Sequence, residues 1–458
     1  MIVYIQFGHS GLHTGTNMYV KSLQVTDLRS VAEGRLDLVY PGRDQDEPFA
    51  GNYNWPPRLP NVNVLLGVNG AGKSTMLDAI ALAALSPVIA DSSGYRPYAL
   101  IRRVARGKSP RAASMEAEIV IHGQDVDGSP GRTDQVRTIS ANVERRGDLE
   151  SLKAAGSIDP IWDGMFQDRS PAFLMVGYGA TRRVESVSSI DESTRSKTRQ
   201  LRYERVASLF EDHFTLRPLA SWLPEWQSIN PGRHKQVVNL INRLSRNDVV
   251  FTGQREGREY LFRVGNNLVP FSALSDGYKA YIGWVGDLLF HVCMGCPPGK
   301  KLVDNKGVVL VDEIDLHIHP EWQRTMIPTL AQALPNLQFI FTSHSPLVVG
   351  TLERANIIHV ETGPRGHAIM KRPGEEVYGL TADQILRSEI FGLDSTRDPG
   401  FKAHLDNLAS EAASGNREAA RLFMRQAARG SAAAEAVSSD RPEMPEWLTS
   451  LASRKFEE

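Results

Sequence analysis

A run of nine residues near the start of the chain has the types and spacing that bind phosphate. Segment 67–75 reads Gly-Val-Asn-Gly-Ala-Gly-Lys-Ser-Thr and matches the pattern Gly-x4-Gly-Lys-Ser/Thr. Glycines let the backbone fold round a phosphate and turn its N–H groups toward the negative charge, next to a helix N-terminus. An incidental glycine turn is the alternative, and the complete pattern favours a phosphate loop. The candidate nucleotide-binding residues are Gly67, Asn69, Gly70, Ala71, Gly72, Lys73, Ser74 and Thr75.

Two adjacent carboxylates supply the second part of the predicted chemistry. Asp312 and Glu313 follow the apolar run 307–311. In a nucleotide site Lys73 would reach the β- and γ-phosphates, while the Ser74 hydroxyl and Asp312 would hold Mg²⁺. Glu313 would orient or deprotonate the attacking water. We therefore expect Ser74 and Asp312 as metal residues, and Lys73 and Glu313 as catalytic residues.

A third candidate element is the turn Leu274-Ser-Asp-Gly277, which opens a helix predicted over 276–294. A helix N-terminus with a serine and a glycine binds anions, although an ordinary cap has the same residues. Ser275, Asp276 and Gly277 are therefore further candidate nucleotide-binding residues.

The elements that must position these residues alternate between strands and helices. The apolar run 62–66 predicts a strand before the phosphate loop, and 76–85 predicts a helix after it. Segments 307–311 and 337–341 are apolar and rich in β-branched or aromatic residues, as are strands inside parallel sheets. A further strand over 356–360 is expected to close that sheet.

Other segments suggest a smaller sheet and a helical insertion. Strands are predicted over 18–25, 36–39, 115–122 and 135–143, and the last two would form a small antiparallel sheet. Segment 172–177 predicts a further short, buried strand. Helical periodicity returns over 201–210 and 236–244, and beyond residue 380. A polar loop is expected over 184–198.

Composition limits the class of protein. A chain of 458 residues predicts two or three structural units, and its 23% charged and 41% apolar residues are typical of a globular protein. With a net charge of −1, any nucleic-acid contact has to come from a local basic patch. Two cysteines fit a reducing cytosol. No signal peptide and no apolar run of ~20 residues is found, so we expect a cytoplasmic protein without membrane contact.

The order of the phosphate loop, the 274–277 turn, Asp312-Glu313 and Thr342-Ser-His344-Ser-Pro346 resembles the ABC-type ATPases, and within them the SMC/RecF-like heads. The resemblance implies that Ser275 and Gly277 complete the site of a facing subunit. It also implies that Asp315 is the D-loop acid and that His344 is a catalytic switch histidine at the γ-phosphate. Arg29 matches an arginine that such heads place near the nucleotide, and a solvated surface arginine is the alternative.

The same resemblance predicts the fold class and the domains. We expect an α/β head with a parallel-rich central sheet flanked by helices, a small antiparallel sheet, an inserted helical lobe and a helical C-terminal extension. The implied divisions are an N-lobe with the phosphate loop, an inserted lobe, a C-lobe with the signature turn, the acidic pair and His344, and an extension for partner docking. Their bounds are 1–125, 126–265, 266–375 and 376–458.

Segments 313–320, 177–182 and 378–386 look like the stand-alone bacterial AAA ATPases of Septu, PARIS and retron anti-phage systems, which occur beside a nuclease or toxin effector. The implied function is Mg²⁺-dependent binding and hydrolysis of ATP by a head-to-tail homodimer or higher oligomer that controls such an effector. A slow-turnover scaffold that holds the effector and a DNA-repair ATPase are the alternatives.

For several residues the sequence leaves two interpretations open. The glutamine that ABC-type ATPases place after a core strand is missing, and either Arg182 or Gln167 replaces it. His291, Cys293 and Cys296 offer three zinc ligands, but two buried thiols at a helix end are favoured because a structural zinc site needs four. Asp315, His317 and His319 alternate like metal ligands, although the resemblance assigns them to the D-loop. The basic clusters 102–111 and 195–205 fit either phosphate binding or solvated faces.

Overall fold

The computed structural model describes most of the chain, from residue 17 to residue 427. Gln167, His317 and the predicted loop after residue 184 lie outside the described residues, as do Arg195, Lys197, Arg199 and everything beyond residue 427. The described ranges are 17–50, 54–90, 95, 97–105, 107–122, 135–155, 175–184, 201–245, 248–296, 299–316, 318–363 and 367–427.

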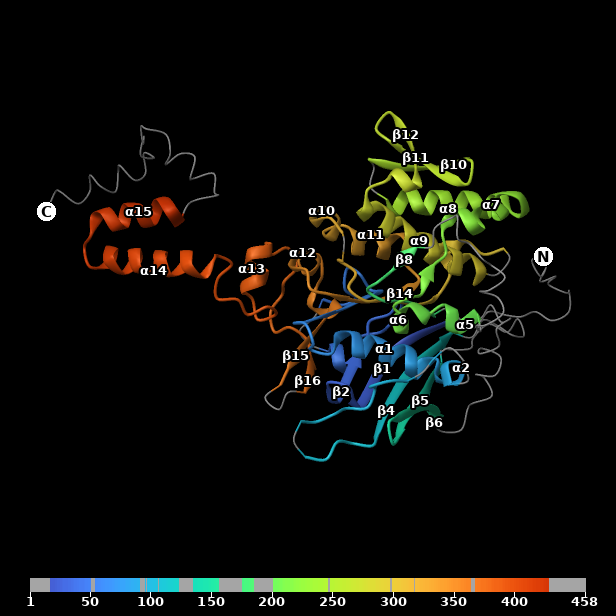
Figure 1. The fold of residues 1–458 in the computed structure, drawn as a ribbon, viewed down its shortest axis with the longest axis horizontal. Helices are drawn as coiled ribbons and strands as arrows, with labels where there is room; N and C mark the ends of the chain where they lie inside the picture. The colour runs from blue at the N-terminus through green and yellow to red at the C-terminus, as the bar shows by residue number, and fades with distance from the viewer. Residues whose placement is uncertain are drawn as a thin grey trace. The chain divides into compact units, whose positions relative to one another are not determined.

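A six-stranded sheet forms the centre of the larger compact unit, Met1–Phe391 (Figure 1). Five neighbouring strands run parallel, and the sixth, β16, pairs antiparallel with β15 at one edge. In spatial order the strands are β16 (Ala368–Lys371), β15 (Ile357–Thr362), β3 (Val62–Leu66), β14 (Leu337–Ser343), β13 (Gly307–Val311) and β7 (Met175–Tyr178). The expectation that the strand near 356–360 closes the sheet is wrong, because β16 folds back beyond it.

The central strands are buried on both faces, which explains their almost continuous apolar sequences. Side chains still alternate between two cores: Val309 and Val311 of β13 point to one, and Val308 and Leu310 point to the other. Because parallel strands end at the same edge, β3, β13 and β14 bring the residues that follow them together.

One core lies between the central sheet and a five-stranded antiparallel sheet, and helix α1 (Lys73–Ala84) packs between the two sheets. Figure 1 shows this layer order. The antiparallel sheet runs β2 (Val31–Asp37), β1 (Asn17–Leu28), β4 (Ala112–His122), β5 (Gln135–Arg146) and β6 (Leu149–Ala155). The predicted pairing of 115–122 with 135–143 is confirmed, inside a larger sheet than expected.

The other core lies between the central sheet and a layer of helices, with a three-stranded antiparallel sheet beyond them (Figure 1). The longer helices are α7 (Leu219–Ile229), α8 (Pro231–Leu244), α9 (Asp276–Met294) and α11 (Met326–Ala333). The three strands are β10 (Val249–Glu256), β11 (Glu259–Val264) and β12 (Asn267–Pro270).

Short elements complete this unit. They are α2 (Ser86–Ala90), α5 (Leu201–Glu204), α6 (Ala207–Phe210), α10 (Pro320–Gln323), α12 (Pro346–Val349), α13 (Ala382–Arg387) and the strand pair β8 (Arg183–Val184) and β9 (Thr215–Leu216). Single 3-10 turns cover Glu47–Phe49, Phe271–Ala273, Leu302–Asp304 and Arg354–Asn356.

The predicted fold class is confirmed: a parallel-rich sheet flanked by helices, an antiparallel sheet and a helical C-terminal part. The chain divides into two compact units, Met1–Phe391 and Gly392–Glu458. In the second, α14 (Pro399–Ala413) packs against α15 (Arg417–Ala427). The four finer domain bounds stay a prediction. No helix in the described part of the chain has both the length and the apolar character needed to cross a bilayer.

Candidate nucleotide-binding site

The phosphate loop joins β3 to α1, as its pattern predicts. Gly67, Gly70 and Gly72 all have positive φ, at 153°, 78° and 110°. At Gly67 a side chain is excluded for a second reason, because a Cβ there would lie 2.0 Å from the carbonyl oxygen of Val360. Asn69 and Gly70 are exposed at the tip of the loop, whereas Ala71, Gly72 and Thr75 are buried against the core. The loop therefore has the backbone freedom and the open tip that phosphate binding needs.

Lys73 folds back over the loop. Its Nζ donates to the carbonyl oxygens of Gly67, at 2.9 Å, and Val68, at 3.0 Å. Burial lowers the pKa of Lys73, and the neighbouring carboxylates of Asp312, Glu313 and Asp315 act in the opposite direction. The Lys73 ammonium group is thus hydrogen-bonded to neutral carbonyl oxygens of the loop and lies near three carboxylates. In this position it could contact a phosphate bound by the loop.

The Asp312 carboxylate meets two hydroxyl groups at the end of β13. Ser74 Oγ donates to Asp312 Oδ1 at 3.0 Å, although the two residues are far apart in the sequence. Thr342 Oγ1, from β14, donates to the same oxygen at 2.5 Å. These are hard oxygen donors of the kind that Mg²⁺ binds, so the residues fit that metal ion.

Glu313 follows in a left-handed backbone conformation, with φ at 48°. Such a conformation is strained for a residue with a side chain. Two neighbours fix it: the Glu313 N–H donates to Thr342 Oγ1 at 2.7 Å, and Arg182 Nη2 donates to the Glu313 carbonyl oxygen at 2.9 Å. Arg182 Nη1 also donates to the Asp312 carbonyl oxygen. The backbone of the acidic pair is therefore held from both sides.

Arg182 is one of the two residues considered as a replacement for the missing glutamine. Burial lowers the pKa of its guanidinium to about 10, against the opposing effect of Asp312, Asp315 and Glu313. It comes from the turn after β7, and sequence pattern alone did not show that it grips the backbone of the acidic pair.

Asp315 and His344 lie beside the same cluster. The Asp315 carboxylate acts to raise the pKa of Lys73, and the charge of Lys73 acts to lower the pKa of His344. Asp315 Oδ1 is buried without a hydrogen-bond partner among the described residues, while the Asp315 carbonyl oxygen accepts from Gln323 Nε2 at 3.3 Å. Burial, followed by the charge of Lys73, lowers the pKa of His344 below its ordinary value of 6.5, which favours the neutral imidazole.

The signature turn stands apart from this cluster. Ser275 is the N-cap residue of α9 but makes no side-chain cap bond, and it is exposed together with Asp276. Asp276 pairs with Lys279 at 2.8 Å. Among the described residues, no hydrogen bond joins Ser275, Asp276 or Gly277 to the phosphate loop of the same chain.

Arg29 lies against α1, one turn after the phosphate loop. Its Nη1 donates to Asp78 Oδ2 at 2.7 Å. Burial raises the pKa of Asp78 to about 7, even though Arg29 draws it down. Asp78 was not among the sequence candidates, because an acid inside an apolar helix has no motif of its own.

A second buried acid connects α9 to the acidic pair. Asp287 Oδ2 accepts from the Tyr178 hydroxyl at 2.9 Å, and its Oδ1 accepts from the Arg217 N–H at 2.8 Å. The Tyr178 carbonyl oxygen in turn accepts from the Asp312 N–H at 2.8 Å. Helix α9 and the end of β13 are therefore joined through one buried tyrosine.

The residues considered for zinc lie elsewhere. Cys293 and Cys296 are buried thiols at the end of α9 that form no disulfide, as favoured, and Arg233 Nη1 donates to Cys296 Sγ at 2.9 Å. Burial raises the pKa of the Cys293 thiol to about 12. His291 pairs with Asp287 at 3.4 Å, and His319 Nδ1 accepts from the Glu321 N–H. Within the described ranges no cluster of three or more His, Cys, Asp or Glu side chains could hold a metal ion.

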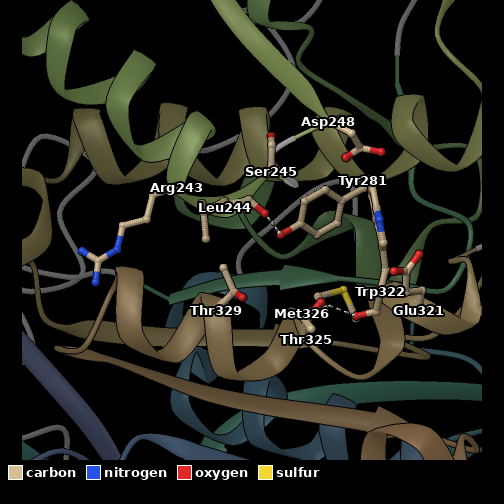
Figure 2. Close-up of a pocket in the computed structure, with 10 residues that line it drawn as sticks. All are labelled: Arg243, Leu244, Ser245, Asp248, Tyr281, Glu321, Trp322, Thr325, Met326 and Thr329. Carbon is tan, nitrogen blue, oxygen red and sulfur yellow. Dashed lines mark hydrogen bonds between the residues drawn. The ribbon is translucent and has the colours of Figure 1, made fainter. Parts of the chain in front are cut away.

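A separate pocket of about 500 Å³ lies between α8, α9, α10 and α11 (Figure 2). The Tyr281 hydroxyl donates to the Leu244 carbonyl oxygen at 3.0 Å at its wall. Figure 2 shows Arg243 at one side of the pocket and Asp248 and Glu321 at the other. None of the predicted nucleotide-site residues lines it.

Comparisons with known proteins found curated relatives of this chain. The Septu protein PtuA of Bacillus mycoides (strain KBAB4) is 24% identical over 387 residues, which are 83% of this chain and 46% of the relative. The retron Ec83 probable ATPase of Escherichia coli is 31% identical over 163 residues, which are 35% of this chain and 30% of the relative. The chain spans less than half the length of these curated relatives.

Among solved structures, the SMC head domain from Thermotoga maritima is 15% identical, with a TM-score of 0.42, and the match covers 77% of this chain and 98% of that one. A family model described as "AAA domain, putative AbiEii toxin, Type IV TA system" matches residues 62–350, from the strand before the phosphate loop to the helix after His344. Because this match spans more than half of the chain and contains the phosphate loop and the acidic pair, the chain belongs to that AAA domain family of P-loop ATPases.

Proposed function

We propose that the protein binds ATP with Mg²⁺ and hydrolyses it at the site between the phosphate loop and the acidic pair. The observation that carries this proposal is the 3.0 Å hydrogen bond between Ser74 Oγ and Asp312 Oδ1. It brings the two predicted metal residues together from opposite parts of the sequence. The curated retron relative is named a probable ATPase, which supports the same activity.

Each residue then has a role that its surroundings permit. Backbone N–H groups of the loop and of the α1 N-terminus receive the phosphates, and Lys73 exchanges its two carbonyl partners for phosphate oxygens. Glu313 orients or deprotonates the attacking water, and neutral His344 donates a hydrogen bond at the γ-phosphate. Mg²⁺, when bound, neutralises phosphate charge.

Removal of the lysine and of the metal ion tests the activity. Lys73→Ala should abolish ATP binding in equilibrium measurements with a fluorescent ATP analogue, and excess EDTA should abolish hydrolysis by the unmodified protein. Lys73→Arg is the matched control for charge, and it should retain part of the binding. Hydrolysis that survives Lys73→Ala would place the activity elsewhere.

A facing subunit completes the site in this proposal. The support is the exposure of Ser275 and Asp276 at the start of α9, where Ser275 makes no side-chain cap bond. An exposed helix N-terminus with these residues is free to meet the phosphates of a partner's nucleotide. Asp315, whose Oδ1 is buried without a hydrogen-bond partner among the described residues, would contribute to the same interface as the D-loop acid. The active unit is therefore a head-to-tail homodimer or a higher oligomer.

The biological role we propose is control of a protein effector, a nuclease or toxin, in anti-phage defence. Its support is similarity to a Septu protein and to retron ATPases. The docking surface is the second compact unit, where α15 leaves Leu422 and Met424 40% and 71% exposed. Co-purification with a nuclease or toxin encoded nearby would support this role, and an effector that binds the chain without the second unit would move the docking surface to the first.

A further inference from the structure

A second candidate site lies beside the turn between β5 and β6 of the five-stranded antiparallel sheet. A pocket of about 640 Å³ is surrounded there by four arginines. Its lining, which we call the arginine pocket, is Tyr98, Arg103, Arg111, Arg145, Arg146, Gly147 and Asp148. None of the nucleotide-site residues lines it. The volume is that of a pocket for a nucleotide-sized group.

The charge of the arginine pocket is unusual for this protein. The whole chain has a net charge of −1, whereas the pocket lining has four arginines and one aspartate. Arg146 is 85% exposed in its side chain and forms a long ion pair, at 3.8 Å, with Glu144. Arg111 is exposed, and its side chain makes no hydrogen bond or ion pair among the described residues. These guanidinium groups are therefore open to an anion from solvent.

Hydrogen bonds and an ion pair fix the wall of the pocket. Glu150, whose side chain is 1% exposed, accepts from the Leu100 N–H at 2.7 Å and pairs with Arg103 at 3.3 Å. The Leu100 carbonyl oxygen accepts from the Arg29 N–H at 2.7 Å. On the other side, Arg145 Nη2 donates to the Pro110 carbonyl oxygen at 3.3 Å. The segment that carries Tyr98 and Arg103 is thus anchored to the sheet.

An aromatic ring stands among these charges. Tyr98 is 78% exposed, which is more than any other Phe, Trp or Tyr among the described residues. Burial of a tyrosine ring is favourable, and this ring is exposed to water beside four arginines. A flat ligand group that stacks on the ring would cover it and gain this free energy. Arginines that contact phosphates, combined with an exposed ring that stacks on a base, are the features that bind single-stranded nucleic acid. A duplex does not offer its base faces to such a ring.

We propose that the arginine pocket binds single-stranded nucleic acid, with Arg111 and Arg146 on the phosphates and Tyr98 stacked on an unpaired base. This site is independent of the proposed ATP site, and binding to it is measured without ATP. Its occupant is a DNA or RNA strand, because both have the same phosphates and base faces.

The test uses fluorescence anisotropy of the full chain with a labelled oligothymidylate of about 15 nucleotides. Arg111→Ala with Arg146→Ala should weaken binding about tenfold or more at low salt and flatten the plot of log affinity against log salt by roughly 0.7 per lost phosphate contact. Tyr98→Ala should weaken binding about fivefold or more, as expected for the loss of one stacked base, and Tyr98→Phe should not.

The matched control is Arg258→Ala with Arg263→Ala, which removes two exposed arginines from the β10–β11 hairpin. It should bind the oligonucleotide like the unmodified chain, and circular dichroism should show all variants folded. An oligouridylate probe separates RNA from DNA as the preferred strand.

Three results would overturn the proposal. One is equal loss of binding in the control and in the Arg111 and Arg146 variant, since net charge alone would then explain binding. Another is tighter binding of a duplex of the same length through the same residues. The third is binding of inorganic pyrophosphate as tightly as the oligonucleotide, which would mark a site for a small anion.

Discussion

Replacing Thr342 with valine removes one hydroxyl group from the centre of the nucleotide site and keeps the shape of the side chain. Thr342 is fully buried, and its hydroxyl donates to the Asp312 carboxylate at 2.5 Å and accepts from the Glu313 N–H at 2.7 Å. A hydrogen bond to a charged group contributes about 1.5–3 kcal/mol and a neutral one about 0.5–1.5 kcal/mol. Thr342→Val should therefore destabilise the protein by about 2–4 kcal/mol.

The same substitution should affect turnover more than binding. It removes the hydrogen bond from the Glu313 N–H, one of the two that fix the strained Glu313 backbone at φ 48°. The Glu313 carboxylate is then no longer held in position. Misplacement of a catalytic group by ~1 Å costs up to about a hundredfold. We expect kcat for ATP hydrolysis to fall about tenfold to a hundredfold, while the dissociation constant of ATP measured without Mg²⁺ stays close to that of the unmodified protein.

Thr342→Ser is the matched control, because it keeps the hydroxyl and loses only a methyl group. It should retain most of the turnover. Steady-state hydrolysis and thermal unfolding of the three proteins give both readouts. If Thr342→Val hydrolyses ATP as fast as Thr342→Ser at the same occupancy of the site, the hydroxyl does not position Glu313 and the reasoning fails.

Three further predictions concern the subunit interface, the second unit and pH. Mixing Lys73→Ala and Ser275→Arg chains should restore hydrolysis, because one of the two composite sites is then intact; no gain over either variant alone, with exchange of subunits confirmed, would contradict the head-to-tail arrangement. A chain ending near Thr396 should stay soluble and hydrolyse ATP but no longer co-purify with a co-expressed effector, and an insoluble or inactive product would make the second unit part of the core. Burial raises the pKa of Asp78 from 3.8 to about 7, so the folded chain holds one proton more than the unfolded chain between about pH 4 and 7. The free energy of unfolding should fall as pH rises through this window, by up to about 4 kcal/mol, and Asp78→Asn should flatten that part of the profile.

Sequence patterns predicted the strands and turns around the nucleotide site because they depend on local constraints. The bounds 62–66, 276–294 and 307–311 agree with β3, α9 and β13. Each is fixed by a glycine loop, a capping turn or an apolar run next to it. The meeting of Ser74 with Asp312 also followed from the motifs, since parallel strands end at one edge.

Contacts that depend on tertiary packing could not be predicted in this way. Arg182 was one of two open choices, and only the fold shows that its turn lies against the backbone of the acidic pair. Thr342 was noted as part of a motif, but its two hydrogen bonds depend on the register of β14 against β13. Asp78 and Asp287 are acids inside apolar helices, and no pattern shows which partner reaches them.

The sheet β10–β12 was missed although its sequence has a signal. Gly257 and Gly265 are at turns between alternating segments, which is typical of hairpins, and both have positive φ. Most of this segment was assigned to the inserted lobe 126–265, and no strand was predicted in it. Alternation of apolar and polar residues has the period of a strand and not that of a helix.

Comparison of ATP binding and ATP hydrolysis by the Glu313→Gln variant tests the central claim most directly. The substitution keeps the size and the hydrogen-bonding capacity of the side chain and removes its charge, so it spares the phosphate loop and the Ser74 and Asp312 oxygens. We predict that the variant binds ATP and Mg²⁺ with the affinity of the unmodified protein and turns over at least about a hundredfold more slowly, the scale on which loss of a general base acts. Steady-state hydrolysis by Glu313→Gln close to that of the unmodified protein would contradict the assignment of the catalytic carboxylate.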